Sequence, residues 1–203
     1  MTCEPNIGFG HAFPLATLVL VDMCKANLTS AQGLQRSAAS GILLGCRAAL
    51  AFARKIGCPV AFVSGSGHGT DDGIPSPWIK GFVPERMDAL FQRRTVSCYS
   101  SPYFADAMRE TAGAIVLAGF LGQGGCLATG ADALLAGHRL TCLSDATLDD
   151  VSDRVFDDTA IRLLRAFTTF DIRVLSTSAW MRSVEEFSIT IDIPRSGSER
   201  FCS

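Results

Sequence analysis

Short apolar runs alternate along the chain with longer stretches in which apolar residues recur at helical spacing. A continuous apolar run suits a strand that is buried on both faces of a parallel sheet. We predict five such strands, at residues 17–23, 58–65, 114–120, 138–146 and 172–177. The predicted helices lie at residues 37–57, 101–113, 125–137 and 155–168. This alternation predicts a three-layer α/β/α fold around a doubly wound, mainly parallel sheet of five or six strands.

Three details of the pattern refine this prediction. Gly57 is expected to end the first long helix, because glycine readily takes the left-handed conformation that closes helices. Residues 66–86 are rich in Gly, Pro and Asp and too long for a simple connection, which indicates a functional loop. Residues 187–193, FSITIDI, alternate and are interpreted as an extra strand or an arm. With no linker or repeat in the sequence, we predict a single domain over residues 1–203.

The composition is apolar, with 48% hydrophobic residues and a mean hydropathy of +0.27. We therefore expect part of the surface to be buried between subunits. Trp78 and Phe82 in the 66–86 segment would contribute to that apolar surface. These features predict a homo-oligomer, either a dimer or a tetramer.

The charge pattern excludes several classes of partner. A net charge of −2 and a pI near 5.9 give no electrostatic reason to bind nucleic acid or an anionic membrane. No apolar run reaches the roughly 20 residues that span a bilayer. The first residues lack the basic and apolar segments of a signal peptide, so we expect a cytoplasmic protein.

The eight cysteines form no CxxC motif, and several fall inside apolar strands or helices. We interpret them as buried free thiols in a reducing compartment rather than as disulfides. His11, His68 and His138 are far apart and have no ligand spacing, so we expect no metal site. We expect no cofactor.

Ligands of such sheets bind beyond the carboxyl ends of the strands. Asp22 ends the first apolar run, where it either caps the next turn or acts as a general acid or base. Arg93 and Arg94 form a basic pair that is either solvated, a carboxylate clamp or an electrostatic partner of Asp22. Trp78 either lines the pocket or covers a neighbouring subunit.

Residues 119–125 contain four glycines and lead into a predicted helix. They form either a tight strand-to-helix turn or a cradle for an oxyanion, because the N–H groups at a helix N-terminus point outward. Cys126 lies in the first turn of that helix, where a thiolate is favoured. It is either a nucleophile or a packing residue.

Four segments, in this order, resemble the isochorismatase-like superfamily, which includes cysteine amidohydrolases and the isochorismatases proper. The first segment, GFG…TLVLVDM, is most similar to the N-carbamoylsarcosine amidase-like branch. The others are RRTVSCYSSPYF, AGFLGQGGCLATGADALLAGHRLTCLSDAT and VLST, at residues 93–104, 118–147 and 174–177. The resemblance covers about residues 8 to 180 and implies the same α/β fold.

The family's catalytic triad is Asp, Lys and Cys, and its positions fall on Asp22, Arg93 and Gly125. Arginine thus replaces the lysine, glycine replaces the cysteine, and Cys126 stands one residue later. One helical position rotates a side chain by about 100°, so we expect Cys126 to face the interior. Isochorismatases can carry a Gly-Cys pair in this place. They rely on the strand-end Asp as a proton donor without a covalent intermediate.

The resemblance also implies the geometry of the cradle. A non-proline cis peptide bond would join Phe120 to Leu121 and aim the N–H groups of Leu121 and Gly125 into the pocket. We assign substrate binding to Phe120, Leu121, Trp78 and Tyr99.

Three hypotheses about function follow. The first is a hydrolase that acts on a small carboxylated metabolite with Asp22 as acid–base and no covalent cysteine intermediate. The second is a C–N amidohydrolase that uses Cys126. The third is a catalytically inactive relative that binds a ligand or a partner.

Overall fold

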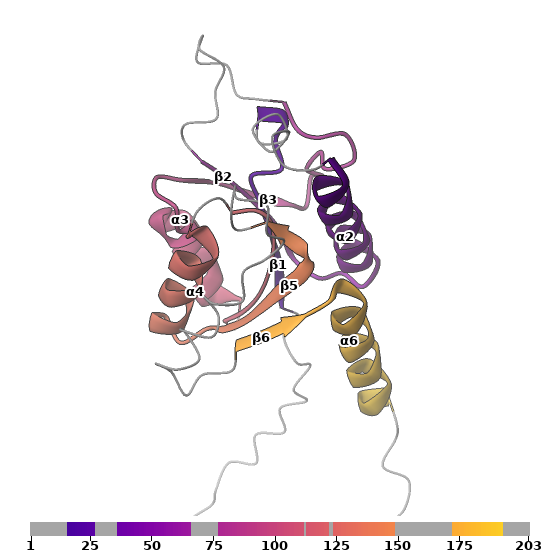
Figure 1. Ribbon diagram of the computed structural model, residues 1–203. Helices are drawn as coiled ribbons and strands as arrows, with labels where there is room; N and C mark the ends of the chain where they lie inside the picture. The colour runs from indigo at the N-terminus through magenta and orange to yellow at the C-terminus, as the bar shows by residue number, and fades with distance from the viewer. Residues whose placement is uncertain are drawn as a thin grey trace, which may run out of the picture.

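The computed structural model describes residues 16–26, 36–65, 77–111, 113–121, 124–148 and 172–192 of the 203-residue chain (Figure 1). The strands are β1 Thr17–Val21, β2 Val60–Gly65, β3 Ala89–Arg93, β4 Ala114–Phe120, β5 Arg139–Leu148 and β6 Ile172–Leu175. The helices are α2 Arg36–Lys55, α3 Pro102–Glu110, α4 Gly125–Leu135 and α6 Thr177–Asp192, with a short 3-10 helix η2 at Cys98–Ser100.

The strands form one six-stranded sheet in the order β3-β2-β1-β4-β5-β6. Every neighbouring pair in this sheet is parallel. From the central strand β1 the chain first moves outward through β2 and β3, and then returns to β4 and moves the other way. This is the doubly wound arrangement that the alternation of strand and helix predicted, and the prediction is confirmed.

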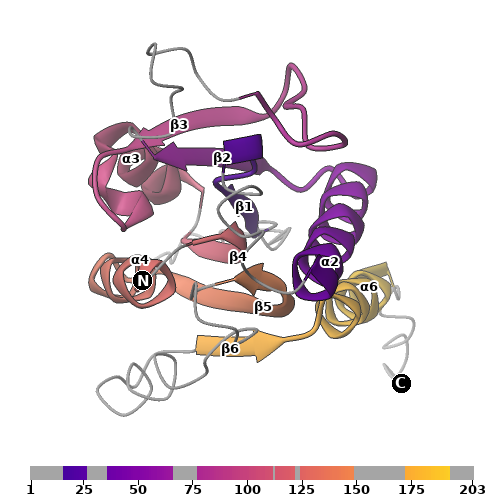
Figure 2. The same ribbon diagram turned by 45° about the horizontal axis from the view of Figure 1, so that its top comes forward.

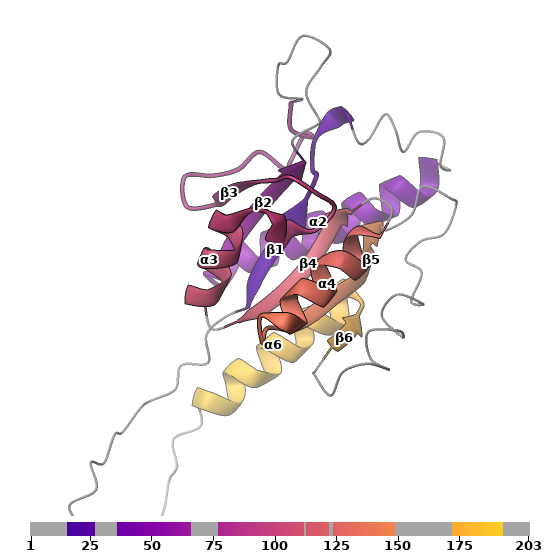
Figure 3. The ribbon, with the colours of Figure 1, turned by 90° about the vertical axis from the view of Figure 1, so that its left-hand side faces the viewer.

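Helices cover both faces of the sheet, which makes three layers (Figure 2). α2 and α6 lie together on one face, and α3 and α4 lie on the other (Figure 3). Side chains of β1 alternate between the two cores: Leu18 and Leu20 pack toward α2, and Val19 and Val21 toward α3 and α4. Because both faces are covered, β1 is buried at every position, and this is why its sequence is a continuous apolar run after Thr17.

Two parts of the pattern-based prediction were wrong. Strand β3 was missed because it lies at the edge of the sheet and most of its residues are exposed, so its sequence ALFQR shows no continuous apolar run. Residues 187–192 continue helix α6 rather than forming a strand or an arm. Once a helix has begun, each further residue adds a hydrogen bond at little cost, which outweighs a short alternating pattern.

Other sequence predictions can be compared directly. Gly57 closes α2 in the left-handed conformation, with φ of +69°, while the Cys58 N–H donates to the Ala53 carbonyl at 2.8 Å. Residues 66–76 of the long loop and the predicted helix at 155–168 lie outside the described residues.

Six cysteines fall within the described residues, and all are free and buried, as predicted: Cys24, Cys46, Cys58, Cys98, Cys126 and Cys142. Burial raises the pKa of Cys46 to about 12, and the pKa values of Cys58 and Cys98 to about 11. These three thiols are therefore neutral near pH 7.

The segment from residue 77 to 86 packs within the protomer. Phe82 is fully buried in the core below α2, and Arg47 lies over its ring at 5.7 Å. The Trp78 ring packs edge-on against Phe62, with ring centroids 5.4 Å apart. Phe82 therefore does not contribute to the exposed apolar surface that the sequence suggested, and Trp78 is partly buried. None of the helices that the structure describes is long and apolar enough to cross a bilayer.

Candidate active site

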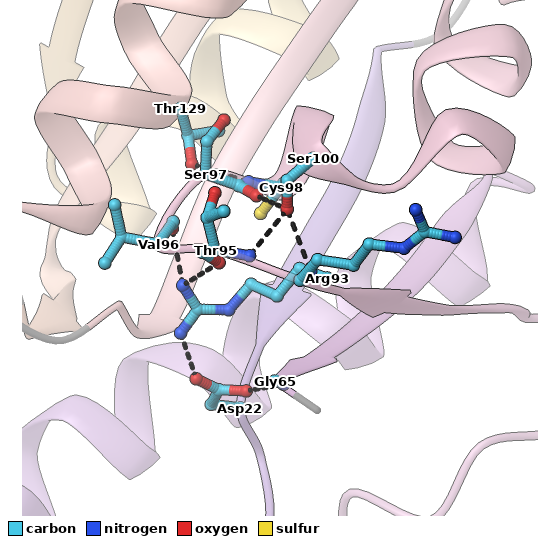
Figure 4. Close-up of polar contacts among 10 residues, drawn as sticks. Asp22, Gly65, Arg93, Thr95, Val96, Ser97, Cys98, Ser100 and Thr129 are labelled. Atoms are coloured by element: carbon cyan, nitrogen blue, oxygen red, sulfur yellow. Dashed lines mark hydrogen bonds and ion pairs between the residues drawn. The ribbon is translucent and has the colours of Figure 1, made fainter. Parts of the chain in front are cut away.

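The carboxyl ends of three neighbouring strands bring together Asp22, Gly65 and Arg93 (Figure 4). Asp22 directly follows β1, while Gly65 and Arg93 end β2 and β3 and are register partners in the sheet. Asp22 is 2% exposed and Arg93 is 7% exposed. A carboxylate and a guanidinium group thus meet in a largely water-free position at the edge where doubly wound sheets bind ligands.

Asp22 is held by its backbone and by its side chain. Its φ of +53° lies in the left-handed region, which Asp tolerates better than most residues. The Asp22 N–H donates to the Val63 carbonyl, and the Asp22 carbonyl accepts from Cys24, both at 2.8 Å. Oδ1 accepts from the Gly65 N–H at 2.8 Å, and Oδ2 pairs with Nη2 of Arg93. The carboxylate orientation is therefore fixed before any ligand binds.

Arg93 joins this carboxylate to the loop that follows β3. Figure 4 shows its guanidinium between Asp22 and the backbone of Thr95 and Val96. Nη1 donates to the Thr95 carbonyl at 3.2 Å and to the Val96 carbonyl. Nε is buried and has no hydrogen-bond partner among the described residues. Arginine stays charged at any physiological pH, so this group supplies a fixed positive charge rather than a mobile proton.

The same loop is fastened to helix α4. The Ser97 hydroxyl donates to the Asp132 carboxylate at 2.6 Å, and the Cys98 N–H donates to the Thr129 hydroxyl at 3.1 Å. The Ser100 hydroxyl accepts from the N–H groups of residues 94 and 95 (Figure 4). The first two bonds therefore fix α4 relative to the loop, and the Ser100 bonds hold the loop itself in place.

Helix α4 begins at Gly125, after Gly124 in the left-handed conformation, and no side chain of the described residues caps it. A Cβ atom built on Gly125 would lie 3.5 Å from the Val96 carbonyl oxygen and 3.1 Å from Cβ of Leu121. Arg93 donates to that same carbonyl. The position at which the resemblance expects a nucleophile therefore lies against the loop that Arg93 holds, and a chain of contacts links Asp22, Arg93 and Gly125.

The Cys126 thiol lies in the core between α4 and the sheet. It is 0% exposed, and its Sγ is 3.6 Å from Sγ of Cys142 on β5. This inward direction is the one that the offset of one residue predicted. The structure does not bring this thiol to the ion pair.

The peptide bond between Phe120 and Leu121 is trans, so the expected cis bond is wrong. The Leu121 N–H donates to the Leu148 carbonyl at 2.8 Å, which extends the pairing of β4 with β5. Both side chains are buried, Phe120 in the core on the α2 side and Leu121 in the core on the α4 side. One of the two expected cradle donors is therefore used by the sheet.

The remaining predicted residues lie around the site in different ways. Trp78 forms an antiparallel bridge with Cys24, two residues after Asp22, and its ring packs against Phe62. The ring of Tyr99 packs edge-on against Phe104, and its hydroxyl hydrogen-bonds with Nδ1 of His138. Burial raises the pKa of the Tyr99 hydroxyl above its ordinary value. The side chain of Tyr99 is thus engaged away from the ion pair.

Sequence reasoning missed Gly65 as a partner of Asp22. The available signal was its place at the end of the second apolar run, because parallel strands end at the same edge of a sheet. Within the described part of the chain, no three His, Cys, Asp or Glu side chains come together as metal ligands would. The site consists of one buried carboxylate, one buried guanidinium and the start of α4.

Comparisons with known proteins agree with this architecture. No curated protein matches the chain. An isochorismatase from Pseudomonas putida KT2440 is 21% identical, with 80% of this chain and 88% of that chain covered and a TM-score of 0.60. N-carbamoylsarcosine amidase from Thermoplasma acidophilum is 22% identical, with 80% of this chain and 96% of that chain covered and a TM-score of 0.60. The MAR1 ribonuclease of Caenorhabditis elegans is 15% identical, with 94% of this chain and 97% of that chain covered and a TM-score of 0.62.

The structural neighbours are too different in sequence to show more than a shared fold. The family is shown by the match of the sequence to a family model. The model for the isochorismatase domain matches residues 16–173, which is well over half of the chain. This range includes strands β1 to β5, the first two residues of β6 and each residue of the candidate site. The chain belongs to the isochorismatase family.

Proposed function

We propose that this protein hydrolyses a small carboxylated metabolite without a covalent cysteine intermediate, with Asp22 as the acid–base residue. The observation that carries the proposal is the buried Asp22–Arg93 pair, joined through the Val96 carbonyl to Gly125. The charged pair occupies the positions of the family's Asp and Lys, whereas residue 125 has no side chain to attack a substrate. The remaining nucleophile is water.

The chemistry for a vinyl ether illustrates the role of Asp22. Asp22 first takes up a proton from water, and its carboxyl group then delivers that proton to the terminal carbon, which creates an oxocarbenium ion. Water adds to that ion and returns a proton, and the resulting hemiketal collapses to a carbonyl compound and an alcohol. No bond to the enzyme forms, so a missing thiol is no obstacle. General acid–base catalysis of this kind contributes a factor of about 10² to 10⁴.

Arg93 supports this step through its charge and its shape. It holds Oδ2 of Asp22 while Gly65 holds Oδ1, so the carboxyl group keeps one orientation. A guanidinium does not give up its proton, and therefore proton transfer at this site falls to Asp22.

A substrate panel tests the proposal. Carboxylated vinyl ethers, amides and ureido acids are offered to the wild type, to Asp22→Asn and to Cys126→Ala, and product formation is followed by mass spectrometry. We expect turnover of at least one carboxylated vinyl ether, a loss of at least about 100-fold in Asp22→Asn, and a change of no more than a few-fold in Cys126→Ala. Turnover that survives Asp22→Asn would contradict the assigned role.

The Cys126 hypothesis has an equally direct readout. Its thiol is fully buried against Cys142, so iodoacetamide should leave turnover unchanged in the folded protein. Loss of activity on alkylation, together with loss in Cys126→Ala, would favour an amidohydrolase.

A second candidate function is a catalytically inactive relative that binds a ligand. It is favoured by the trans bond before Leu121 and by the Leu121 N–H, which the sheet uses. A site with one cradle donor fewer stabilises a developing oxyanion less well. A panel compound that binds tightly and persists unchanged would support this function over hydrolysis.

The proposal includes a homo-oligomer, either a dimer or a tetramer. Its support is the apolar composition and two exposed apolar side chains, Leu90 in the edge strand β3 at 60% exposure and Met87 just before this strand at 91%. Sedimentation velocity at micromolar concentration should show a species of at least twice the 21.6 kDa chain mass. A monomer under these conditions would contradict the proposal.

A further inference from the structure

The guanidinium of Arg93 has more donors than its surroundings use. Of the five N–H bonds that an arginine carries, Nη1 donates to two backbone carbonyls and Nη2 to the Asp22 carboxylate. Nε is buried, and no described residue accepts from it. A buried donor without an acceptor is costly, more so when it belongs to a charged group. The Nε–H and the second N–H of Nη2 are therefore left without an acceptor among these contacts.

The surroundings favour a negatively charged acceptor. The negative charge of Asp22 is shared between two donors, because Oδ1 accepts from the Gly65 N–H at 2.8 Å while Oδ2 pairs with Arg93. Helix α4 begins at Gly125, beside the Val96 carbonyl that Arg93 holds, and no side chain in the described part of the chain caps its positive end. Guanidinium groups also form strong, bidentate bonds with carboxylates, whose two oxygens match their planar edge.

We propose that Arg93, through its Nε–H, is the residue that selects a carboxylate on the bound ligand. The inference rests on the proposed function, since it names the group of the substrate that this site recognises. The carboxylate would lie beside Asp22, so that the reactive bond of a small ligand is within reach of the acid–base group. Arg93 then has two tasks, which are to position Asp22 and to hold the ligand.

This role gives a physical reason for the departure from the family triad. A lysine ammonium at position 93 could pair with Asp22, but it has no planar edge and no Nε–H beside the paired nitrogen. Replacing lysine by arginine keeps the positive charge next to Asp22 and adds a directed donor. The substitution therefore changes which ligands bind more than it changes the charge of the site.

Binding of matched charged and neutral probes tests the inference. Isothermal titration calorimetry with benzoate against benzamide, and pyruvate against pyruvamide, compares a carboxylate with an uncharged group of nearly the same shape. We expect the wild type to bind at least one acid at least tenfold more tightly than its amide. In Arg93→Lys, which keeps a cation beside Asp22, that preference should fall to less than threefold. Arg94→Lys, at the exposed neighbouring position, should keep the wild-type preference within twofold.

The outcomes separate this inference from the proposed function. Equal affinity for acids and amides in the wild type, or no binding of either, would overturn the carboxylate site without any variant. An unchanged preference in Arg93→Lys would overturn the role of Arg93, with circular dichroism verifying that the variant is folded. A carboxylate preference without turnover of any panel substrate leaves the inference standing and removes hydrolysis. Turnover of neutral substrates only would overturn the carboxylate site and leave hydrolysis standing.

Discussion

The buried ion pair between Asp22 and Arg93 makes a strong prediction about stability. Its side chains are 3% and 8% exposed, and the two partners lie 71 residues apart in the sequence. Removing one member of such a pair leaves the other as a buried charge without its counterion, which costs about 3–5 kcal/mol. Asp22→Asn is the best perturbation because asparagine has the same shape and also tolerates the positive φ of +53°.

We expect Asp22→Asn to lower the free energy of unfolding by about 3 kcal/mol, at the lower end of this range because the Thr95 and Val96 carbonyls still accept from Arg93. Urea unfolding, followed by far-UV circular dichroism at one fixed protein concentration, measures the change. The double variant Asp22→Asn, Arg93→Met removes both charges but keeps an unbranched apolar side chain at position 93. Replacing both members of a buried pair is often nearly neutral, so this variant should regain at least about half of the loss.

Two results would refute this reasoning. A loss below about 1 kcal/mol in Asp22→Asn is the range of an exposed ion pair and would show that solvent screens the charges. A double variant that is as unstable as the sum of the two single variants would show that the two side chains are not coupled. Comparing both variants with the activity of Asp22→Asn also separates a loss of catalysis from a loss of folding.

Three further predictions follow from the packing. Gly119→Ala should abolish folding or cost more than about 3 kcal/mol, because φ is +112° and a Cβ would lie 2.3 Å from the Val21 carbonyl oxygen. Gly41→Ala, in the middle of α2 with open space around it, should stabilise the protein by about 0.5–1 kcal/mol; urea unfolding of the two variants measures both changes, and similar effects would contradict the argument. Burial, and then the charge of Arg109, lower the pKa of His138 below its ordinary value of 6.5. The unfolded chain therefore takes up this proton first, and stability should fall as the pH drops below about 6.5. His138→Gln should show a smaller loss between pH 7.5 and 5.5 in urea unfolding, and an equal loss would rule out this group.

The sequence by itself determined the central strands and the place of the acid. β1, β2 and β4 are covered by helices on both faces. Their side chains are therefore buried on both sides of the sheet, and their sequences are continuous apolar runs. The position of Asp22 at the end of β1 follows from the same run. The inward direction of Cys126 was predictable too, because helix geometry turns each side chain by a fixed angle from its neighbour. These are local consequences of strand and helix periodicity.

The tertiary structure decided the partners of those elements. Asp22 is held by residues 43 and 71 positions away: nothing near it in sequence identifies Gly65, and the pairing with Arg93, one of the alternatives that the sequence left open, is decided only by the folded sheet. The peptide bond after Phe120 is trans, and the Leu121 N–H that follows it donates to the Leu148 carbonyl of the neighbouring strand. Edge strand β3 is defined by its hydrogen bonds to β2 rather than by its own exposed residues. Each of these features depends on segments that only meet once the sheet has assembled, which is why local patterns do not reveal them.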